Sequence, residues 1–193
     1  MELKTYISPG CFDESLAEGG QPRAASRVLV DFMQQRSFKE AQELQKLADA
    51  AIARQGISFT VYSDQGNIDR AWPFDIWPRT IEVSEWQDVE RGLAQRLKAL
   101  NCFIDDVYND QRIFKAGIVP EDIVLSSKNF RPECVGIKPR YGAWANICGS
   151  DLVRDASGQF FVLEDNLRVP SGVSYMLENR AVMKPDRKSC MII

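Results

Sequence analysis

Two stretches of the chain place apolar side chains at every third or fourth position, and this spacing predicts an amphipathic helix in each. The first extends from about Arg27 to Arg54. The second opens at Ser84, which has capping-box spacing to Gln87, and continues to Ile104. The pattern therefore predicts long helices in the first half of the chain.

The segment between these helices favours a strand and turns. Gly56 is placed to end the first helix, and Ile57–Tyr62 alternates as a strand does. A turn is predicted at Gly66 and Asn67. The two prolines of the following WPFDIWPR exclude a regular helix or a central strand there.

The second half of the chain favours strands. A short helix is predicted after Pro120, and strands are predicted from Val135 onward in VGIKP, YGAWANICG, DLVRD and QFFVLED. Pro170, at the first helical position, is expected to open a last helix. The predicted fold class is α/β (α+β), with N-terminal helices followed by an antiparallel sheet.

The composition excludes several classes of protein. The 193 residues, 45% of them hydrophobic and 26% charged, suffice for one good-sized domain or part of a larger one. A net charge of −3 without a basic run predicts no nucleic-acid partner. No apolar run approaches the roughly 18–20 residues of a membrane helix, and no signal peptide is evident, so we expect no membrane partner and a cytoplasmic location.

Cysteine and histidine usage narrows the chemistry. The five cysteines are widely spaced, which indicates reduced thiols and not a disulfide framework or a zinc site. The chain has no histidine, and this excludes histidine triads, histidine zinc sites and a histidine general base.

A strand that ends in Glu-Asp-Asn gives the chain its candidate site. Alternation along Phe160–Asn166 places Glu164 and Asn166 on one face, about 6.5–7 Å apart, while Asp165 points the other way. If the hairpin loop is Ala156 to Gln159, Asp151 lies directly opposite Glu164. A loop one residue shorter moves Asp151 out of this register.

Three oxygen-bearing side chains that converge in this way are suited to Mg²⁺, which is held by one or two carboxylates while phosphates and water complete its shell. Asp151, Glu164 and Asn166 are the predicted metal ligands. Arg168 could pair with phosphate oxygens, and Ser171 and Gly172 at a helix start would offer backbone N–H groups to an anion.

A purely structural interpretation competes with this site. A hairpin that ends in Glu-Asp-Asn is also typical of a solvated strand end followed by a turn. In that interpretation Arg168 is a surface residue paired with Asp165, and Pro170 and Ser171 form a helix cap. The residues alone leave both interpretations open.

The segment GSDLVRDASGQFFVLEDNLRVPSGVSYMLENR resembles the signature of the circularly permuted ATP-grasp proteins, which are related to the glutathionylspermidine synthases. The resemblance extends upstream through RAWPFDIWPRTI, EWQDVERGLAQRLKALNCFIDDVYNDQRI and VPEDIVLSSKNF, and covers roughly residues 20–183. It implies an enzyme that uses ATP and Mg²⁺ to join small carboxylate and amine substrates, peptide-like or amino-acid-like, through an acyl phosphate.

Carried over position by position, the resemblance makes Asp151, Glu164 and Asn166 the magnesium ligands. It places Arg168, as a catalytic and nucleotide-binding residue, with Ser171 and Gly172 at the nucleotide and substrate site. Family members are well over twice as long, so the expectation is an N-terminal part that holds half of the active site of an incomplete ATP-grasp fold. The lysines that grip ATP are not assigned, and Lys138 is not given that role.

The predicted organisation is an irregular leader (1–27), the N-terminal part of the permuted domain (28–183) and a divergent tail (184–193). Because half of the cleft is expected to lie elsewhere, we expect this chain by itself to be inactive. One alternative is a non-catalytic module that binds an anion or a protein partner, with WPFDIWP and YGAWA as an apolar patch instead of core. Another is a remnant that hardly folds.

Overall fold

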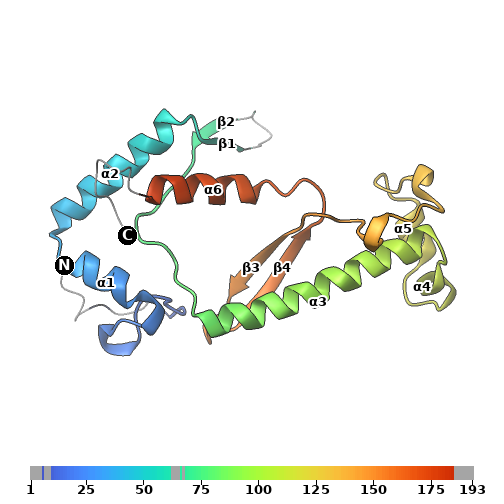
Figure 1. Cartoon of the computed structure of the whole chain (residues 1–193), viewed down its shortest axis with the longest axis horizontal. Coiled ribbons are helices and arrows are strands. Elements are labelled where there is room, and N and C mark those ends of the chain that lie inside the picture. The colour runs from blue at the N-terminus through green and yellow to red at the C-terminus, as the bar shows by residue number, and fades with distance from the viewer. Residues whose placement is uncertain (1–5, 7–9, 62–65, 67, 185–193) are drawn as a thin grey trace. The chain divides into compact units, whose positions relative to one another are not determined.

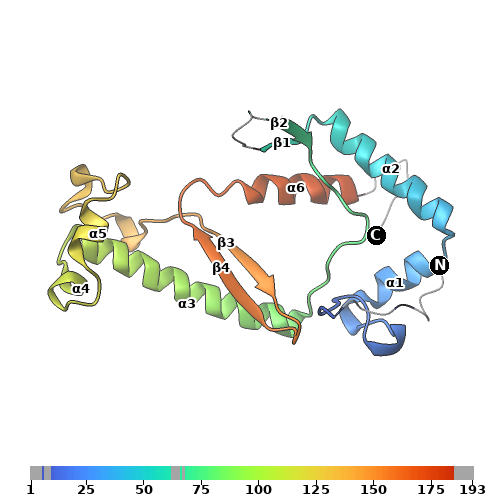
Figure 2. The same ribbon diagram turned by 180° about the vertical axis from the view of Figure 1, so that it is seen from behind.

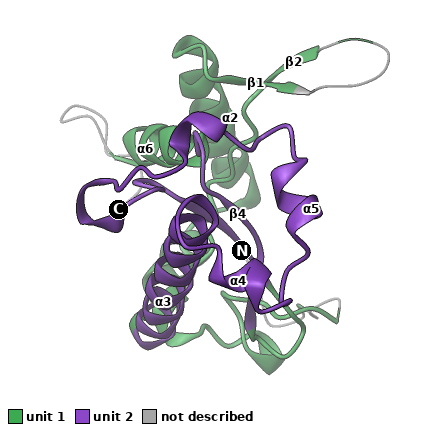
Figure 3. Ribbon diagram, turned by 90° about the vertical axis from the view of Figure 1, so that its right-hand side faces the viewer, with its two compact units in different colours: residues 1–83, 154–159, 171–193 green, residues 84–153, 160–170 purple. Residues whose placement is uncertain are grey.

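The computed structural model describes residues 6, 10–61, 66 and 68–184, which form two compact units (Figure 3). Unit 1 comprises residues 1–83, 154–159 and 171–193, and unit 2 comprises residues 84–153 and 160–170. The predicted turn at Gly66 and Asn67 and the tail beyond Lys184 lie largely outside the described residues.

Unit 1 contains helices α1 (Arg27–Gln34) and α2 (Phe38–Arg54) and the antiparallel strands β1 (Ser58–Val61) and β2 (Ile68–Ala71). The first predicted helix is thus two helices. The division falls where Ser37 caps α2: its hydroxyl accepts a hydrogen bond from the Glu40 N–H at 3.3 Å, and its own N–H donates to the Glu40 carboxylate at 2.7 Å. This reciprocal capping box makes Ser37 a helix start, which interrupts the periodic pattern.

The core of unit 1 forms between α1, α2 and the segment that follows β2. Helix α6 (Gly172–Met183) packs against it through Val182 and Met183, and contacts α2. The buried apolar residues of this core are Leu29, Met33, Ala41, Ala48 and Ile76. Trp77 packs against the same core, so the proline-rich segment WPFDIWPR serves as core packing.

Unit 2 is organised around the long helix α3 (Val83–Tyr108), which begins one residue before Ser84. Short helices α4 (Arg112–Lys115) and α5 (Glu121–Leu125) follow it. The strands β3 (Gly149–Arg154) and β4 (Phe160–Asn166) form a two-stranded sheet. Both opposite views of the molecule show this sheet beside α3 (Figures 1 and 2).

Short 3₁₀ turns complete the described chain. They span Glu18–Gly20, Ala24–Ser26, Pro132–Cys134 and Arg140–Gly142. The α+β class, with helices first and an antiparallel hairpin late, is confirmed.

The strands predicted in VGIKP and YGAWANICG are wrong for most of their length. Residues 135–147 instead form turns, and only Gly149 onward enters a strand. Pro139 supplies no N–H for a strand ladder, and Tyr141 and Gly142 take positive φ values of 61° and 67°, which no extended strand contains.

The start of the last helix also differs from its prediction. Helix α6 begins at Gly172, so Pro170 precedes it and is not its first residue. Ser171 occupies the N-cap position without a side-chain cap hydrogen bond. The helix-cap interpretation of Pro170 and Ser171 therefore lacks the hydrogen bond that would define it.

The tip of the β3–β4 hairpin is fixed by its own polar groups. The Asp155 N–H donates to the Gln159 carbonyl at 3.0 Å, so the loop is Ala156 to Gly158 and the predicted loop of Ala156 to Gln159 is wrong. The Asp155 carboxylate accepts from the N–H groups of Ser157 and Gln159, both at 2.9 Å. Hydrogen bonds from Ser157 and Gln159 hold the pKa of the Asp155 carboxyl below its ordinary value.

Candidate functional site

Asp151, Glu164 and Asn166 meet on one exposed face of the β3–β4 hairpin. The Asn166 amide Nδ2 donates to the Asp151 carboxylate at 3.3 Å and to the Glu164 carboxylate at 3.0 Å. All three side chains are exposed. We call these residues the Asp-Glu-Asn trio.

We infer that an extra residue in β4 accounts for this convergence. Asp155 pairs with Gln159 at the hairpin tip. If this pairing continued regularly along both strands, Asp151 and Glu164 would lie on opposite faces of the hairpin. The Ser150 hydroxyl nevertheless donates to Asp165 at 2.7 Å, which indicates that the pairing has shifted by one residue there. Leu163 and Glu164 are both exposed in succession, where a regular strand would alternate. A β-bulge inferred at this point would place Asp151 opposite Glu164.

The opposite face of β4 is held by Asp165, as strand alternation predicts. Its carboxylate accepts a hydrogen bond from Ser150 at 2.7 Å and pairs with Arg96 of α3 at 2.5 Å. The Asp165 side chain is only 7% exposed and the Arg96 side chain 48%. The hydrogen bond from Ser150, assisted by Arg96, holds the pKa of the Asp165 carboxyl below its ordinary value. This contact anchors the strand behind the trio.

Asp165→Asn is expected to destabilise the chain by about 1 kcal/mol near neutral pH, because hydrogen bonds to a charged acceptor are lost. The depressed pKa of Asp165 contributes stability that is present above the ordinary carboxyl pKa and is lost as the pH falls through the folded value. The variant should therefore lose part of the acid dependence. Urea melts at pH 6 and pH 3 measure this.

Asp88→Asn is the matched control, because Asp88 pairs with Arg91 on the same helix with both side chains more than 70% exposed. Exposed pairs contribute little, so this variant should melt like the parent at both pH values. Equal acid sensitivity of the Asp165→Asn variant and the parent would contradict the anchoring role.

The donor set of the trio fits Mg²⁺ by chemistry. Two carboxylates and one carboxamide offer only oxygen, the ligand type that this hard cation prefers. A 180° rotation of the Asn166 amide exchanges its Oδ1 and Nδ2 atoms. In that orientation Oδ1 would face the same point as the carboxylates of Asp151 and Glu164. Among the described residues no group of three or more His, Cys, Asp or Glu could hold a metal. A cation here would therefore need further oxygen ligands, as Mg²⁺ commonly takes from phosphates and water.

The remaining predicted site residues are placed separately. Arg168 is exposed just after β4 and makes no ion pair within the described chain, since Arg96 and not Arg168 is the partner of Asp165. Ser171 and Gly172 belong to unit 1, at the start of α6. Their role beside the trio stays a prediction.

Val169 follows Arg168 with a φ of 51°, in the left-handed region that β-branched residues rarely adopt. The residue before a proline is normally extended, so this conformation is strained on two counts. Strain of this kind concentrates at ligand sites.

Sequence reasoning missed the residues that support the trio. Arg96 looks like any exposed helical arginine, and nothing in its spacing points to Asp165, 69 residues away. Gly149 offers a clearer signal, as a glycine at a strand start. A Cβ at Gly149 would lie 2.9 Å from Cβ of Pro170 and 3.8 Å from Cβ of Asn166, so glycine permits this close packing.

Trp72 and Trp144 of the two aromatic segments serve packing, whereas Tyr141 of YGAWA is exposed. Trp72 stacks on Tyr175 with ring centroids 3.9 Å apart and donates to Asn179 at 2.9 Å, both within unit 1. Trp144 stacks on Tyr108 and donates to Asp105 at 3.1 Å within unit 2. No helix in the described part of the chain has the length and apolar content needed to cross a bilayer.

Comparison with known proteins places this geometry in context. The family described as circularly permuted ATP-grasp type 2 matches residues 78–189, more than half of the chain. The chain is 50% identical over 184 residues to the Synechocystis protein named "Uncharacterized protein sll0335", covering 95% of this chain and 38% of that protein. It is 46% identical over 147 residues to the Mycobacterium tuberculosis protein named "Uncharacterized protein Rv2411c", covering 75% of this chain and 26% of that one.

A more distant relative carries a name that mentions a reaction. The chain is 36% identical over 179 residues to a Frankia alni protein named "Putative glutamate--cysteine ligase 2-3", covering 92% of this chain and 20% of that protein. The chain thus spans less than two fifths of the length of each of these relatives.

Proposed function

The chain belongs to the circularly permuted ATP-grasp type 2 family, and on that premise we propose that it is part of an ATP- and Mg²⁺-dependent ligase that joins a carboxylate to an amine. The Asp-Glu-Asn trio is its metal site. The match spans the whole β3–β4 hairpin and α6, so the trio lies within the matched region, which supports this assignment.

One observation carries the metal assignment. Asn166 Nδ2 lies within hydrogen-bonding distance of both Asp151 and Glu164, which brings three oxygen-bearing side chains to one point on an exposed face. Two carboxylates that share one amide donor still repel each other, and a cation would offset this repulsion more strongly than the Asn166 amide does. Their convergence supports a site prepared for a cation.

The roles of the other residues follow from charge and position. Arg168 would pair with phosphate oxygens through its fork of donors, while Ser171 and Gly172 would offer backbone N–H groups at the start of α6. A bound Mg²⁺ would neutralise phosphate charge during transfer. With no histidine in the chain, catalysis would rest on positioning and charge, which suffice for phosphoryl transfer.

The substrate class is an amino-acid-like or peptide-like carboxylate and an amine. The name of the Frankia alni relative, with glutamate and cysteine in it, supports this class. Because the chain spans a minor part of its relatives, the complete cleft requires more sequence than these 193 residues. We therefore expect metal–nucleotide binding by this chain without turnover.

Calorimetric titration with ATP tests the proposal, once in the presence of Mg²⁺ and once with EDTA. Saturable binding that requires Mg²⁺ is the expected result. ATP binding of equal strength with EDTA would overturn the metal site and would favour a metal-independent anion-binding module. Turnover of ATP in a steady-state assay would contradict the expected inactivity.

A further inference from the structure

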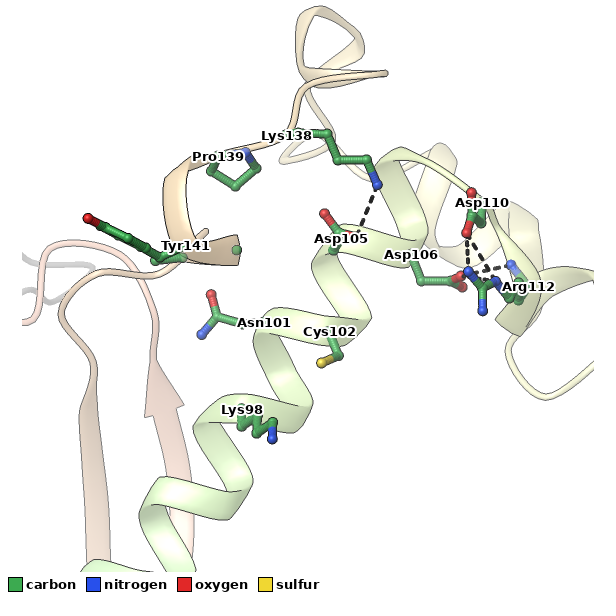
Figure 4. A pocket seen from close by; sticks show the side chains of 12 residues that line it. Lys98, Asn101, Cys102, Asp105, Asp106, Asp110, Arg112, Lys138, Pro139 and Tyr141 are labelled. Atoms are coloured by element: carbon green, nitrogen blue, oxygen red, sulfur yellow. Dashed lines mark hydrogen bonds and ion pairs between the residues drawn. The ribbon is translucent and has the colours of Figure 1, made fainter.

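A pocket of about 720 Å³ opens in unit 2 between the second half of α3 and the segment of residues 138–143 (Figure 4). Hydrogen bonds connect α3 with the segment that follows residue 143. The Ala145 N–H donates to Asn101 Oδ1 at 2.9 Å, and the Trp144 indole N–H donates to Asp105 at 3.1 Å. The ring of Trp144 also stacks on Tyr108, with centroids 5.0 Å apart. These contacts therefore fix the distance between α3 and the segment of residues 138–143.

The lining of the pocket has balanced charge. Three cations face three carboxylates, and these six residues are Lys98, Arg112, Lys138, Asp105, Asp106 and Asp110. A nucleotide triphosphate would meet three carboxylates here, and a bare metal ion would meet three cations. The charge balance disfavours both ligands and favours one that carries both signs.

Two of the carboxylates already have structural partners. Asp106 accepts from the backbone N–H groups of Arg112 at 3.0 Å and Ile113 at 2.9 Å, at the first turn of α4. Asp110 pairs with the Arg112 guanidinium. These groups hold α4 in place and have little capacity left for a ligand.

The groups that remain for a ligand are Lys98, Lys138 and the Oδ2 oxygen of Asp105, because Asp105 Oδ1 already accepts from Trp144 and Asn109. Lys98 is exposed and makes no ion pair within the described residues. Figure 4 shows Lys138 reaching across the pocket toward Asp105, where the two charges are 3.5 Å apart with the lysine side chain 66% exposed. A contact this long and exposed is easily exchanged for a ligand.

Lys98 and Asp105 are seven residues apart on one face of α3, which separates them by about 10.5 Å along the axis. The Lys98 ammonium and the Asp105 carboxylate therefore lie at the two ends of this distance. A molecule that fits between them could place its own carboxylate beside Lys98 and its own ammonium beside Asp105. Tyr141, whose backbone has a strained φ of 61°, lies at the rim. Its ring is exposed, with the Arg140 guanidinium 4.7 Å from the ring centroid.

We propose that this pocket binds a small zwitterion, an amino acid or short peptide, with its carboxylate on Lys98 and its ammonium on Asp105. The assignment rests on the proposed ligase function, for which it names an amino-acid-like substrate and a binding place distinct from the trio. Lys138 contributes from the opposite wall.

The test is a titration of the ¹⁵N-labelled chain followed by NMR, with glycylglycine as the probe. N-acetylglycylglycine, which lacks the ammonium, and glycylglycinamide, which lacks the carboxylate, are the matched probes. Glycylglycine should shift the amide signals of residues 98–106 and 138–143 saturably, and each blocked probe should bind about tenfold more weakly. Equal binding of the three peptides, or no shifts in the pocket, would overturn the proposal.

Lys98→Gln should weaken glycylglycine binding about tenfold, because it removes the ammonium charge of an exposed side chain without disturbing the walls. Lys128→Gln, an exposed lysine of the same unit outside the pocket, is the control and should bind like the parent. Unchanged binding by Lys98→Gln would contradict the assignment even if the pocket residues shift.

Calorimetry with Mg²⁺ and ATP on the Lys98→Gln variant separates this inference from the proposed function. The variant should bind Mg²⁺ and ATP like the parent, because Lys98 is not in the trio. If the parent binds Mg²⁺ and ATP but does not bind glycylglycine, the pocket assignment alone is refuted. If the parent does not bind Mg²⁺ and ATP, the proposed function is refuted. The glycylglycine titration would then still show whether the pocket binds a zwitterion.

Discussion

Glu164→Gln is expected to weaken Mg²⁺-dependent ATP binding about 100-fold, a change of about 2.8 kcal/mol. Glutamine keeps the shape of the side chain and its hydrogen bond from Asn166 but removes the negative charge that a hard cation requires. The free energy of unfolding should change little, because Glu164 is exposed. Calorimetry at fixed Mg²⁺ measures the affinity, and a thermal melt confirms the fold.

Glu90→Gln is the control for this variant. Glu90 is an exposed glutamate on α3 within the same unit, so the substitution removes the same charge from elsewhere. It should leave the affinity unchanged. If both variants lose affinity equally, the effect is one of net charge, and the trio is not a metal site.

Gly158→Ala is expected to destabilise the chain by about 2–4 kcal/mol. Gly158 has a φ of +90°, and a Cβ there would lie 2.6 Å from a ring carbon of Phe12. That ring cannot move away freely, because the guanidinium groups of Arg23 and Arg154 lie over it at 4.2 Å and 3.9 Å. Urea melts monitored by circular dichroism measure the loss.

Gly92→Ala, also a glycine-to-alanine substitution, is expected to have the opposite effect on stability. Gly92 lies inside α3 with no atom within 4 Å of its would-be Cβ, so alanine should stabilise the chain by about 0.5–1 kcal/mol. In a Phe12→Ala background Gly158→Ala should cost less, because the steric part of the penalty is gone. An equal cost in both backgrounds would show that Phe12 does not pack on the hairpin tip.

The hairpin shows how far strand alternation reaches and where it fails. Alternation correctly places Glu164 and Asn166 together and Asp165 on the other face. The predicted four-residue loop is wrong, because the Asp155 carboxylate and the positive φ of Gly158 close a three-residue loop. The bulge compensates for the missing residue, so Asp151 reaches the trio by a route that the pattern does not contain.

Helices were predictable to the extent that local signals define them. The apolar stripe of α3 and the short helix after Pro120 are where their patterns indicate. The division at Ser37 was not recognised, although Ser37 and Glu40 have the spacing of a capping box. Local signals exist there, and the periodic stripe that continues across them concealed the break.

Tertiary contacts set the limit for the rest. The segment from Val135 to Cys148 is rich in apolar and aromatic residues and was predicted as strands, yet Trp144 packs on α3 from an irregular segment. Likewise, the contact between Arg96 and Asp165 joins positions 69 residues apart. Neither a period of two nor a period of 3.6 encodes such pairings.

The central claim, a metal–nucleotide site at the Asp-Glu-Asn trio, is tested most directly by NMR with Mn²⁺ in place of Mg²⁺. In the presence of ATP, substoichiometric Mn²⁺ should broaden the backbone amide signals of Asp151, Glu164 and Asn166 first, together with the side-chain amide of Asn166. Broadening that spares these residues, or that centres on the carboxylates of the α3 pocket, would contradict the site.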